Sequence, residues 1–170
     1  MDILLRPEKP ADYEAITQLT FAAFTSHSYQ PTEHFIVLGL REAGALSLSL
    51  VAEAEGRIVG HVAFSKVMIN GEDLSWYGLG PISVQPALQK LGIGSTLLQD
   101  GLSRIRDMGA KGCVVLGNHL YYQRFDFHPS PGLIYEGAPA PEYFMAYPFG
   151  DEIPKGKVEY HKAFYSTASE

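Results

Sequence analysis

The sequence predicts an α/β fold with a mixed, mostly antiparallel central sheet flanked by helices, and three observations indicate it. First, the 170 residues are 46% hydrophobic and 19% charged, which is typical of a globular domain that buries a core. Second, stretches with helical spacing of apolar residues alternate with short β-type runs bounded by turn signals. Third, these elements follow one another in the order β-α-α-β-β-β-α-β-α-β, which places helices against a sheet.

The composition excludes several classes of protein. The only cysteine, Cys113, cannot form an intrachain disulfide, which favours a reducing compartment. No apolar run is long enough to cross a bilayer, and the first residues lack the basic and apolar regions of a signal peptide. The net charge of −6 argues against a nucleic-acid partner and is compatible with a cationic substrate. We therefore expect one cytoplasmic domain over residues 1–170, with no membrane partner.

The N-terminal part of the chain predicts one strand and two helices. A strand over residues 3–6 is closed by Pro7. Apolar residues at helical spacing predict a helix over residues 12–24 that packs one face inward. A second helix is expected over residues 33–41, and Gly39 weakens its end.

Two consecutive hairpins are expected next. Leucine and alanine alternate with serine and valine over residues 46–52, which predicts a strand. After a turn over residues 53–56, residues 57–68 form the return strand. The dipeptide Asn70-Gly71 is a strong hairpin signal, so residues 74–84 should pair back against that strand.

The strand over residues 74–84 contains Gly78, Gly80 and Pro81 in its middle. Proline cannot donate a hydrogen bond to a sheet, and glycines inside strands often mark bulges or a close approach of the backbone. We therefore expect this strand to be distorted near Pro81.

A long amphipathic helix is expected over residues 92–108, after a loop over residues 85–91, and Gly109 is suited to its C-terminal cap. Its expected buried stripe consists of Ile93, Leu97, Leu98, Leu102, Ile105 and Met108.

The remaining elements are shorter. Residues 113–116 are apolar on both faces and predict a strand in the middle of the sheet, and residues 120–124 predict a short helix. Prolines and aromatic residues over 129–148 indicate irregular connections and short strands. A last strand is expected over residues 157–164.

A glycine-containing stretch precedes the long helix. It reads Gln89-Lys90-Leu91-Gly92-Ile93-Gly94-Ser95, and no acidic residue follows before Asp100. A helix N-terminus presents backbone N–H groups and a positive dipole end to an anion, and glycines let the backbone approach that anion closely. The spacing fits neither a P-loop nor a dinucleotide fingerprint. Two interpretations stay open at this point, a phosphate cradle or a loop that only starts a helix.

Three stretches together resemble the GNAT superfamily of N-acetyltransferases. Gln89-x-x-Gly92-x-Gly94 is similar to the family signature Gln/Arg-x-x-Gly-x-Gly/Ala, and residues 79–86 resemble the strand that leads into it. Residues 121–127, Tyr-Tyr-Gln-Arg-Phe-Asp-Phe, resemble the family segment aromatic-Tyr-x-x-x-Gly-Phe, with Asp126 in place of the glycine. The resemblance covers about residues 1–130, whereas residues 131–170 carry no motif. It implies a GNAT-like sheet with a bulged and splayed fourth strand.

The resemblance also implies acetyl-CoA as the acyl donor and assigns roles to residues. Ile82, Ser83 and Val84 would pair with the pantetheine arm and polarise the thioester carbonyl. Gln89 to Ser95 would cradle the pyrophosphate. Tyr122 matches the tyrosine that protonates the leaving thiolate, with Tyr121 as an immediate competitor. Asn118 is expected either to hydrogen-bond the cofactor or to serve as a turn residue.

The general base and the acceptor are not assigned by the sequence. Five residues are candidates for the base, and each is also compatible with a structural role: Glu33, His34, His61, Glu72 and His119. No metal is expected, because the histidines show no ligand spacing with cysteine or carboxylate. Three aromatic residues are candidates to line an acceptor pocket together with the C-terminal part: Phe21, Phe24 and Tyr29.

The expected activity is transfer of an acetyl group to a primary amine of a small molecule or peptide, by direct attack in a ternary complex. One alternative is an acetyl-CoA sensor without turnover. Another is a toxin-like enzyme that acetylates aminoacyl-tRNA, which the net charge of −6 disfavours. The sequence leaves a homodimer open.

Overall fold

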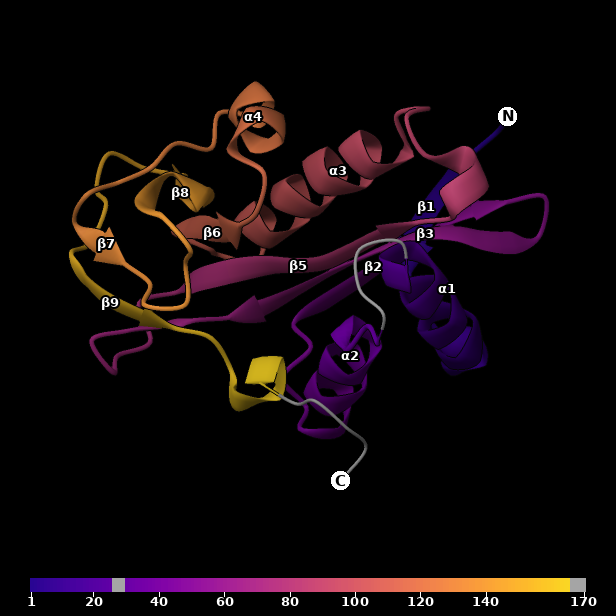
Figure 1. The fold of residues 1–170 in the computed structure, drawn as a ribbon, viewed down its shortest axis with the longest axis horizontal. Helices are drawn as coiled ribbons and strands as arrows, with labels where there is room; N and C mark the ends of the chain where they lie inside the picture. The colour runs from indigo at the N-terminus through magenta and orange to yellow at the C-terminus, as the bar shows by residue number, and fades with distance from the viewer. Residues whose placement is uncertain (26–29, 166–170) are drawn as a thin grey trace. The chain divides into compact units, whose positions relative to one another are not determined.

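The structure is a computed structural model that describes residues 1–25 and 30–165 (Figure 1). By its internal packing the chain divides into two compact units. The first comprises Met1–Phe64, Gly80–Gly101 and Lys162–Glu170, and the second comprises Ser65–Leu79 and Leu102–His161. The single domain expected over 1–170 stays a prediction.

The strands of the described residues form a larger and a smaller sheet. The larger sheet has the order β1-β2-β3-β5-β6-β8, and its strands are β1 Leu4–Pro7, β2 Leu48–Ala54, β3 Arg57–Lys66, β5 Trp76–Val84, β6 Gly112–Leu116 and β8 Phe144–Pro148. The smaller sheet has the order β4-β9-β7, with β4 Met68–Ile69, β9 Gly156–Glu159 and β7 Leu133–Ile134. In the larger sheet β5 and β6 are parallel, whereas the pairs β1·β2, β2·β3 and β6·β8 are antiparallel. The predicted mixed, mostly antiparallel sheet is confirmed.

The helices also lie close to their predicted positions. They are α1 Tyr13–Thr25, α2 Glu33–Glu42, α3 Ile93–Asp107 and α4 His119–Tyr122. Figure 1 shows α1 and α2 side by side, in indigo and purple.

In the first unit, helices cover both faces of the strands β2 and β3. Ile16 of α1 and Val37 of α2 pack against Val51, and all three side chains are buried. On the other face, Gly60 is so close to α3 that an added Cβ would lie 2.8 Å from Leu97 and 2.9 Å from Ile93. This double cover explains why β2 buries residues of both faces instead of showing the alternation that its sequence suggests.

The first hairpin is tighter than expected. β2 continues to Ala54, so the turn consists of Glu55 and Gly56 rather than residues 53–56. Both turn residues have positive φ values, 51° and 76°, as a two-residue turn with the twist of the flanking strands requires. The register shifts between Ala52 and Glu53, and this bulge changes which face the following side chains occupy.

The predicted return strand over residues 57–68 is divided in two. β3 ends at Lys66, and Met68–Ile69 form β4, which pairs with β9 in the smaller sheet. The turn at Asn70 and Gly71 is confirmed by φ values of 53° and 76°. The following strand, β5, lies next to β3 in the sheet, as predicted.

The predicted distortion of β5 is confirmed. Gly80 has a φ of 139°, the peptide bond to Pro81 is cis, and the register with β6 ends at Gly78, opposite Val114. Both strands continue beyond that pair, to Val84 in β5 and to Leu116 in β6. The parallel pairing is therefore confined to the first residues of β5.

In the second unit, β6 lies between β5 and β8, which confirms a strand in the middle of the sheet. β8 and β7 are short strands within residues 129–148, where irregular connections and short strands were expected without bounds. The predicted last strand over residues 157–164 is wrong in its second half: β9 ends at Glu159, and Lys162–Tyr165 form a 3-10 helix.

The long helix matches its predicted stripe with one exception. Met108 is 50% exposed because α3 ends at Asp107, whereas the other five stripe residues are buried. Gly109 takes the expected cap conformation with a φ of 100°.

The close approach of α3 to β3 makes a stability prediction. Gly60→Ala should lower the free energy of unfolding by about 1–3 kcal/mol, because its methyl group must displace the side chains of Leu97 and Ile93. Gly150→Ala is the matched control, since an added Cβ there meets nothing within 4 Å. Chemical denaturation measures both variants, and equal stabilities would contradict the close packing.

Candidate active site

The predicted cradle lies in the first unit, at the start of α3. The first hydrogen bond of the helical pattern runs from the N–H of Thr96 to the carbonyl of Gly92, at 3.0 Å. The N–H groups of the three preceding residues therefore lie before the helical ladder, where a helix commonly binds anions. The first turn carries no acidic residue. This helix start is chemically suited to a phosphate.

The backbone of the cradle has two residues in the left-handed region. Gly92 has a φ of 89°, and an added Cβ would meet nothing within 4 Å, so open space lies on that side. Lys90 has a φ of 68°, which is unfavourable for a lysine by about 1 kcal/mol or more. Gln89 stabilises the approach to this turn, because its side-chain amide donates to the carbonyl of Val84 at 3.2 Å. Strain at Lys90, whose charge lies beside the helix start, agrees with a ligand-binding turn.

The end of β5 provides the second part of the predicted cofactor site. Ile82 and Val84 are partly exposed, whereas Ser83 is 3% exposed and its hydroxyl has no hydrogen-bond partner among the described residues. Buried hydroxyls are usually paired. The Ser83 hydroxyl lies in the part of β5 that has no partner on β6. A ligand bound there would supply the missing hydrogen bonds with its own polar groups.

Tyr122 lies in the second unit, on the short helix that follows β6. Asn118 caps this helix, because its side-chain oxygen accepts a hydrogen bond from the N–H of Leu120 at 3.0 Å. That contact supports the turn role of Asn118, one of its two predicted roles. Gly117 makes room for the tyrosine, since a Cβ on Gly117 would lie 2.8 Å from the ring of Tyr122. The sequence analysis missed Gly117, although a glycine directly before a helix cap is a recognisable signal.

The phenol of Tyr122 is in an apolar environment. The residue is 8% exposed, and its ring makes edge contacts with Tyr121 and Phe127. Burial, with smaller contributions from Tyr121 and Cys113, raises the pKa of Tyr122 above its ordinary value of 10. The phenol therefore stays protonated at neutral pH, as a proton donor must.

Asp126 stands where the similar family segment has a glycine. Its φ of 66° and ψ of 23° are left-handed, and its N–H bonds to the carbonyl of Gln123 at 3.1 Å. Aspartate tolerates this region better than most residues. The substitution is accommodated at the end of the turn that follows Tyr122.

The candidate bases differ in their environments. Glu33 begins α2, and Glu72 lies in the turn that closes on β4. Burial lowers the pKa of His34, which packs against Phe21 and Phe35. The position of each of these three residues is therefore compatible with a structural role.

Two candidates, His119 and His61, differ in their access to a ligand. His119 lies beside Tyr143, with ring centroids 5.5 Å apart, and belongs to the same short helix as Tyr122. His61 is fully buried and cannot reach a substrate. Among the predicted acceptor-lining residues, Phe21 is 48% exposed, and Tyr29 lies outside the described residues.

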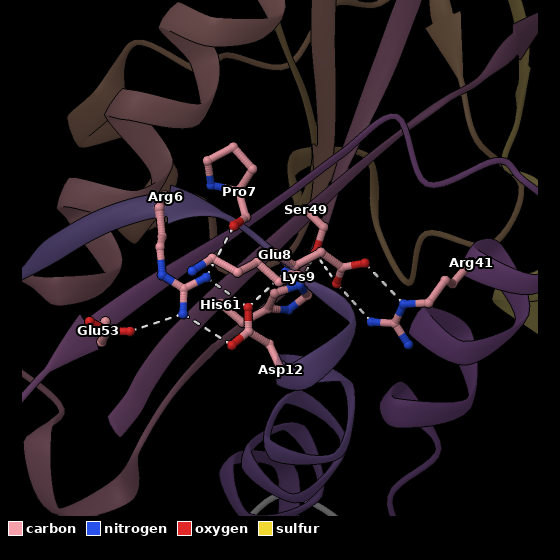
Figure 2. A network of polar contacts seen from close by, with 9 residues as sticks. All are labelled: Arg6, Pro7, Glu8, Lys9, Asp12, Arg41, Ser49, Glu53 and His61. Carbon is pink, nitrogen blue, oxygen red and sulfur yellow. Dashed lines mark hydrogen bonds and ion pairs between the residues drawn. The ribbon is translucent and has the colours of Figure 1, made fainter. Parts of the chain in front are cut away.

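His61 belongs instead to a buried polar network in the first unit (Figure 2). The Ser49 hydroxyl donates to Glu8 at 2.6 Å and lies 2.8 Å from Nε2 of His61. Since the hydroxyl proton goes to Glu8, the ring proton of His61 must be on Nε2. Arg41 donates two hydrogen bonds to Glu8, at 2.8 and 3.0 Å. Burial raises the pKa of Glu8, but the bonds from Arg41 and Ser49 outweigh it and leave the pKa below its ordinary value.

A second set of ion pairs in Figure 2 fixes the start of α1. Arg6 donates to both oxygens of Asp12, at 2.7 and 3.0 Å, and to Glu53 at 2.9 Å. The N–H of Lys9 also donates to Asp12, at 2.7 Å. The hydrogen bond from Arg6 keeps the pKa of Asp12 below its ordinary value. These contacts connect β1 and β2 with the 3-10 turn Pro10–Asp12 that leads into α1, so both polar sets are structural.

The polar residues of the described chain do not form a metal site. No group of three or more histidine, cysteine, aspartate or glutamate side chains within residues 1–25 and 30–165 could hold a metal ion. In the same residues, no helix is both long and apolar enough to span a bilayer.

Comparisons with known proteins identify the class. The profile described as the acetyltransferase (GNAT) family matches residues 13–127. The chain belongs to this family and is an N-acetyltransferase that uses acetyl-CoA.

Individual relatives agree over nearly the whole chain. A GNAT family acetyltransferase from Brucella melitensis, solved in complex with acetyl-CoA, is 46% identical with a TM-score of 0.85, covering 96% of this chain and 98% of its own. The N-acetyltransferase YhbS of Escherichia coli K12 is 34% identical, covering 95% of this chain and 98% of its own. A structure of Escherichia coli YhbS in complex with CoA has a TM-score of 0.89 at 33% identity, covering 98% of this chain and 93% of its own.

The buried imidazole makes a prediction about stability and pH. Burial lowers the pKa of His61 from 6.5 to about 4, because a second ring proton would lack a partner at Nδ1. Between these two values the unfolded chain binds a proton that the folded chain does not. The free energy of unfolding should therefore fall by about 1.4 kcal/mol per unit as the pH drops from 6.5 towards 4.

Denaturant titrations at several pH values test this expectation. His61→Phe removes the titrating group and should flatten the profile in this window. His128→Phe, at an exposed ring, should keep the wild-type slope. A wild-type stability that stays constant from pH 6.5 to 4.5 would show that His61 is not held neutral by burial.

Proposed function

We propose that this N-acetyltransferase transfers the acetyl group of acetyl-CoA directly to a primary amine of a small molecule or peptide, in a ternary complex. The observation that carries the proposal is Tyr122, a buried and protonated phenol at the position of the family tyrosine. A protein that only sensed acetyl-CoA would not need a positioned proton donor.

Two segments are proposed to bind the cofactor, the end of β5 and the start of α3. The end of β5, Ile82 to Val84, binds the pantetheine arm through backbone groups that have no partner on β6. The helix start from Gln89 to Ser95 binds the pyrophosphate through N–H groups and the charge of Lys90. The related Brucella melitensis enzyme was solved with acetyl-CoA, and the Escherichia coli one with CoA, which supports this ligand.

The proposed chemistry needs one proton donor. The amine nitrogen attacks the thioester carbonyl carbon, the bond to sulfur breaks, and the thiolate leaves with the electron pair. Tyr122 gives its phenol proton to the sulfur, and the proton lost from the amine nitrogen returns to the tyrosine through solvent. The products are the amide and free CoA thiol.

The proposal also includes the location of the enzyme and one class of acceptor that it disfavours. The cytoplasm is the proposed location, because Cys113 is a free, fully buried thiol that suits a reducing compartment. The net charge of −6 disfavours aminoacyl-tRNA as the acceptor, since binding RNA relies on cationic contacts with phosphates.

Replacing the proposed acid should separate chemistry from binding. Tyr122→Phe should lower kcat by about a hundredfold or more, because general acid catalysis contributes on that order, and should leave the Kd for acetyl-CoA within about twofold. Tyr121→Phe is the control and should keep most activity. Thiol release over a panel of amines measures kcat, and calorimetry measures Kd. Unchanged turnover in Tyr122→Phe would remove this residue from the mechanism, and thiol release dependent on an amine would exclude a sensor without turnover.

Replacing the cradle glycine should affect the cofactor alone. Gly92→Val places a branched side chain in the open space before α3 and should weaken acetyl-CoA binding by more than about tenfold, since the phosphate must approach the backbone. Gly44→Val is the matched control, because Gly44 also has a positive φ, 68°, and open space around it. Both variants place a β-branched residue at a positive φ, and only the first lies at the cradle, so only the first should lose affinity in calorimetry. Normal affinity in Gly92→Val would refute the cradle.

A further inference from the structure

An apolar cavity lies in the second unit, within the proline-rich segment after Tyr122. Its volume is about 450 Å³, which is in the range of small-molecule sites. All its lining residues fall between Pro129 and Phe144, and none of them carries a charge. The larger side chains of the lining are Leu133, Ile134, Tyr135 and Phe144.

The wall of this cavity is connected to the helix that carries Tyr122. Phe144 pairs with Leu116, the last residue of β6, and so lies at the end of the strand that leads to α4. The carbonyl of the neighbouring Tyr143 accepts a hydrogen bond from the N–H of Gly117 at 2.9 Å. Gly117 in turn is the residue on which the ring of Tyr122 lies. The cavity wall and the proposed acid therefore both lie at the end of β6, with Phe144 and Tyr122 on opposite faces of the pair β6 and β8.

A larger hollow of the same unit does not share this position. It measures about 1040 Å³ and includes Lys111, Asp151 and Glu152 in its lining. Lys111 precedes the first residue of β6, so this hollow lies at the end of the strand opposite to Tyr122. The apolar cavity is therefore the better candidate to hold the unreactive part of an acceptor whose amine reacts near Tyr122.

The lining determines the chemistry that the apolar cavity accepts. A charged group would lose its hydration there without gaining a partner, whereas an apolar group would be stabilised by about 25 cal/mol for each Å² removed from water. The volume is about three times that of a cavity known to hold benzene, so a ring with a short chain fits.

We propose that this cavity binds the side group of the acceptor, and that the acceptor is a primary amine carrying an aromatic or branched aliphatic group. The proposal rests on the proposed function, because it assumes that the acceptor is a primary amine. The cavity holds the part of this amine that does not react. Selection of the acceptor then depends on burial of its apolar part, and the amine extends out of the cavity past the end of β6, where Phe144 pairs with Leu116.

A variant that fills the cavity tests this proposal. Ala138→Phe adds a ring to the lining, and Ala22→Phe adds the same ring at an exposed position of α1. With 2-phenylethylamine as acceptor, Ala138→Phe should raise KM at least about tenfold, since filling a pocket of this kind has effects of that order. With methylamine both variants should match the wild type. The wild type should prefer 2-phenylethylamine to putrescine by at least tenfold in kcat/KM.

Binding without turnover separates this proposal from the proposed function. In the presence of CoA, N-acetyl-2-phenylethylamine should bind the wild type and the Ala22→Phe variant equally in calorimetry, and Ala138→Phe at least tenfold more weakly. If no amine releases thiol but this binding pattern holds, the proposed function fails and the apolar site stands. If putrescine reacts as well as 2-phenylethylamine, or the amide binds all three proteins equally, the apolar site is overturned. A loss of activity in Ala138→Phe only with hexanoyl-CoA would assign the cavity to the acyl chain and also overturn it.

Discussion

The end of the pairing between β5 and β6 is the constraint on which the candidate site depends. Parallel strands normally continue their ladder for as long as both run, yet this register stops at Gly78 and Val114 although each strand goes on. Pro81 has no N–H to donate, and Gly80 takes a φ of 139° that L-residues rarely adopt. The rest of β5 therefore keeps backbone groups that a ligand can use, and the buried hydroxyl of Ser83 without a partner lies in the same segment.

Much of this arrangement could be predicted from the sequence because it depends on local chemistry. The distortion of β5 follows from Gly80 and Pro81, and the start of α3 follows from the change of period after Gly92. The resemblance of residues 121–127 to a family segment is the reason for proposing Tyr122 as the acid, and the left-handed φ of Asp126 shows why an aspartate can stand in that segment. Each of these signals acts within a few residues along the chain.

The features that the sequence did not reveal depend on distant partners. Short strands were expected among residues 129–148, but the bounds of β8 follow from the pairing of Phe144 to Pro148 with β6, which lies far away along the chain. Residues 162–164 were expected to continue a strand, but Ala163 packs against Leu40 of α2 in a 3-10 helix. The role of His61 is likewise tertiary, because Glu8, Ser49 and His61 come from three strand regions that no periodicity relates. An isolated histidine in a strand gives no sign of such a network.

The burial of Tyr122 has opposite effects on its suitability as an acid. A raised pKa makes the phenol a weaker donor in water, and this effect alone would slow proton transfer to sulfur. The same apolar surroundings, however, raise the proton affinity of a thiolate that forms beside it, since burial disfavours both anions. The difference between the pKa of the phenol and the pKa of the thiol therefore changes much less than either pKa alone. What burial adds is a fixed position, because Gly117 and Phe127 hold the ring on two sides. We therefore propose that Tyr122 acts through placement rather than through acidity.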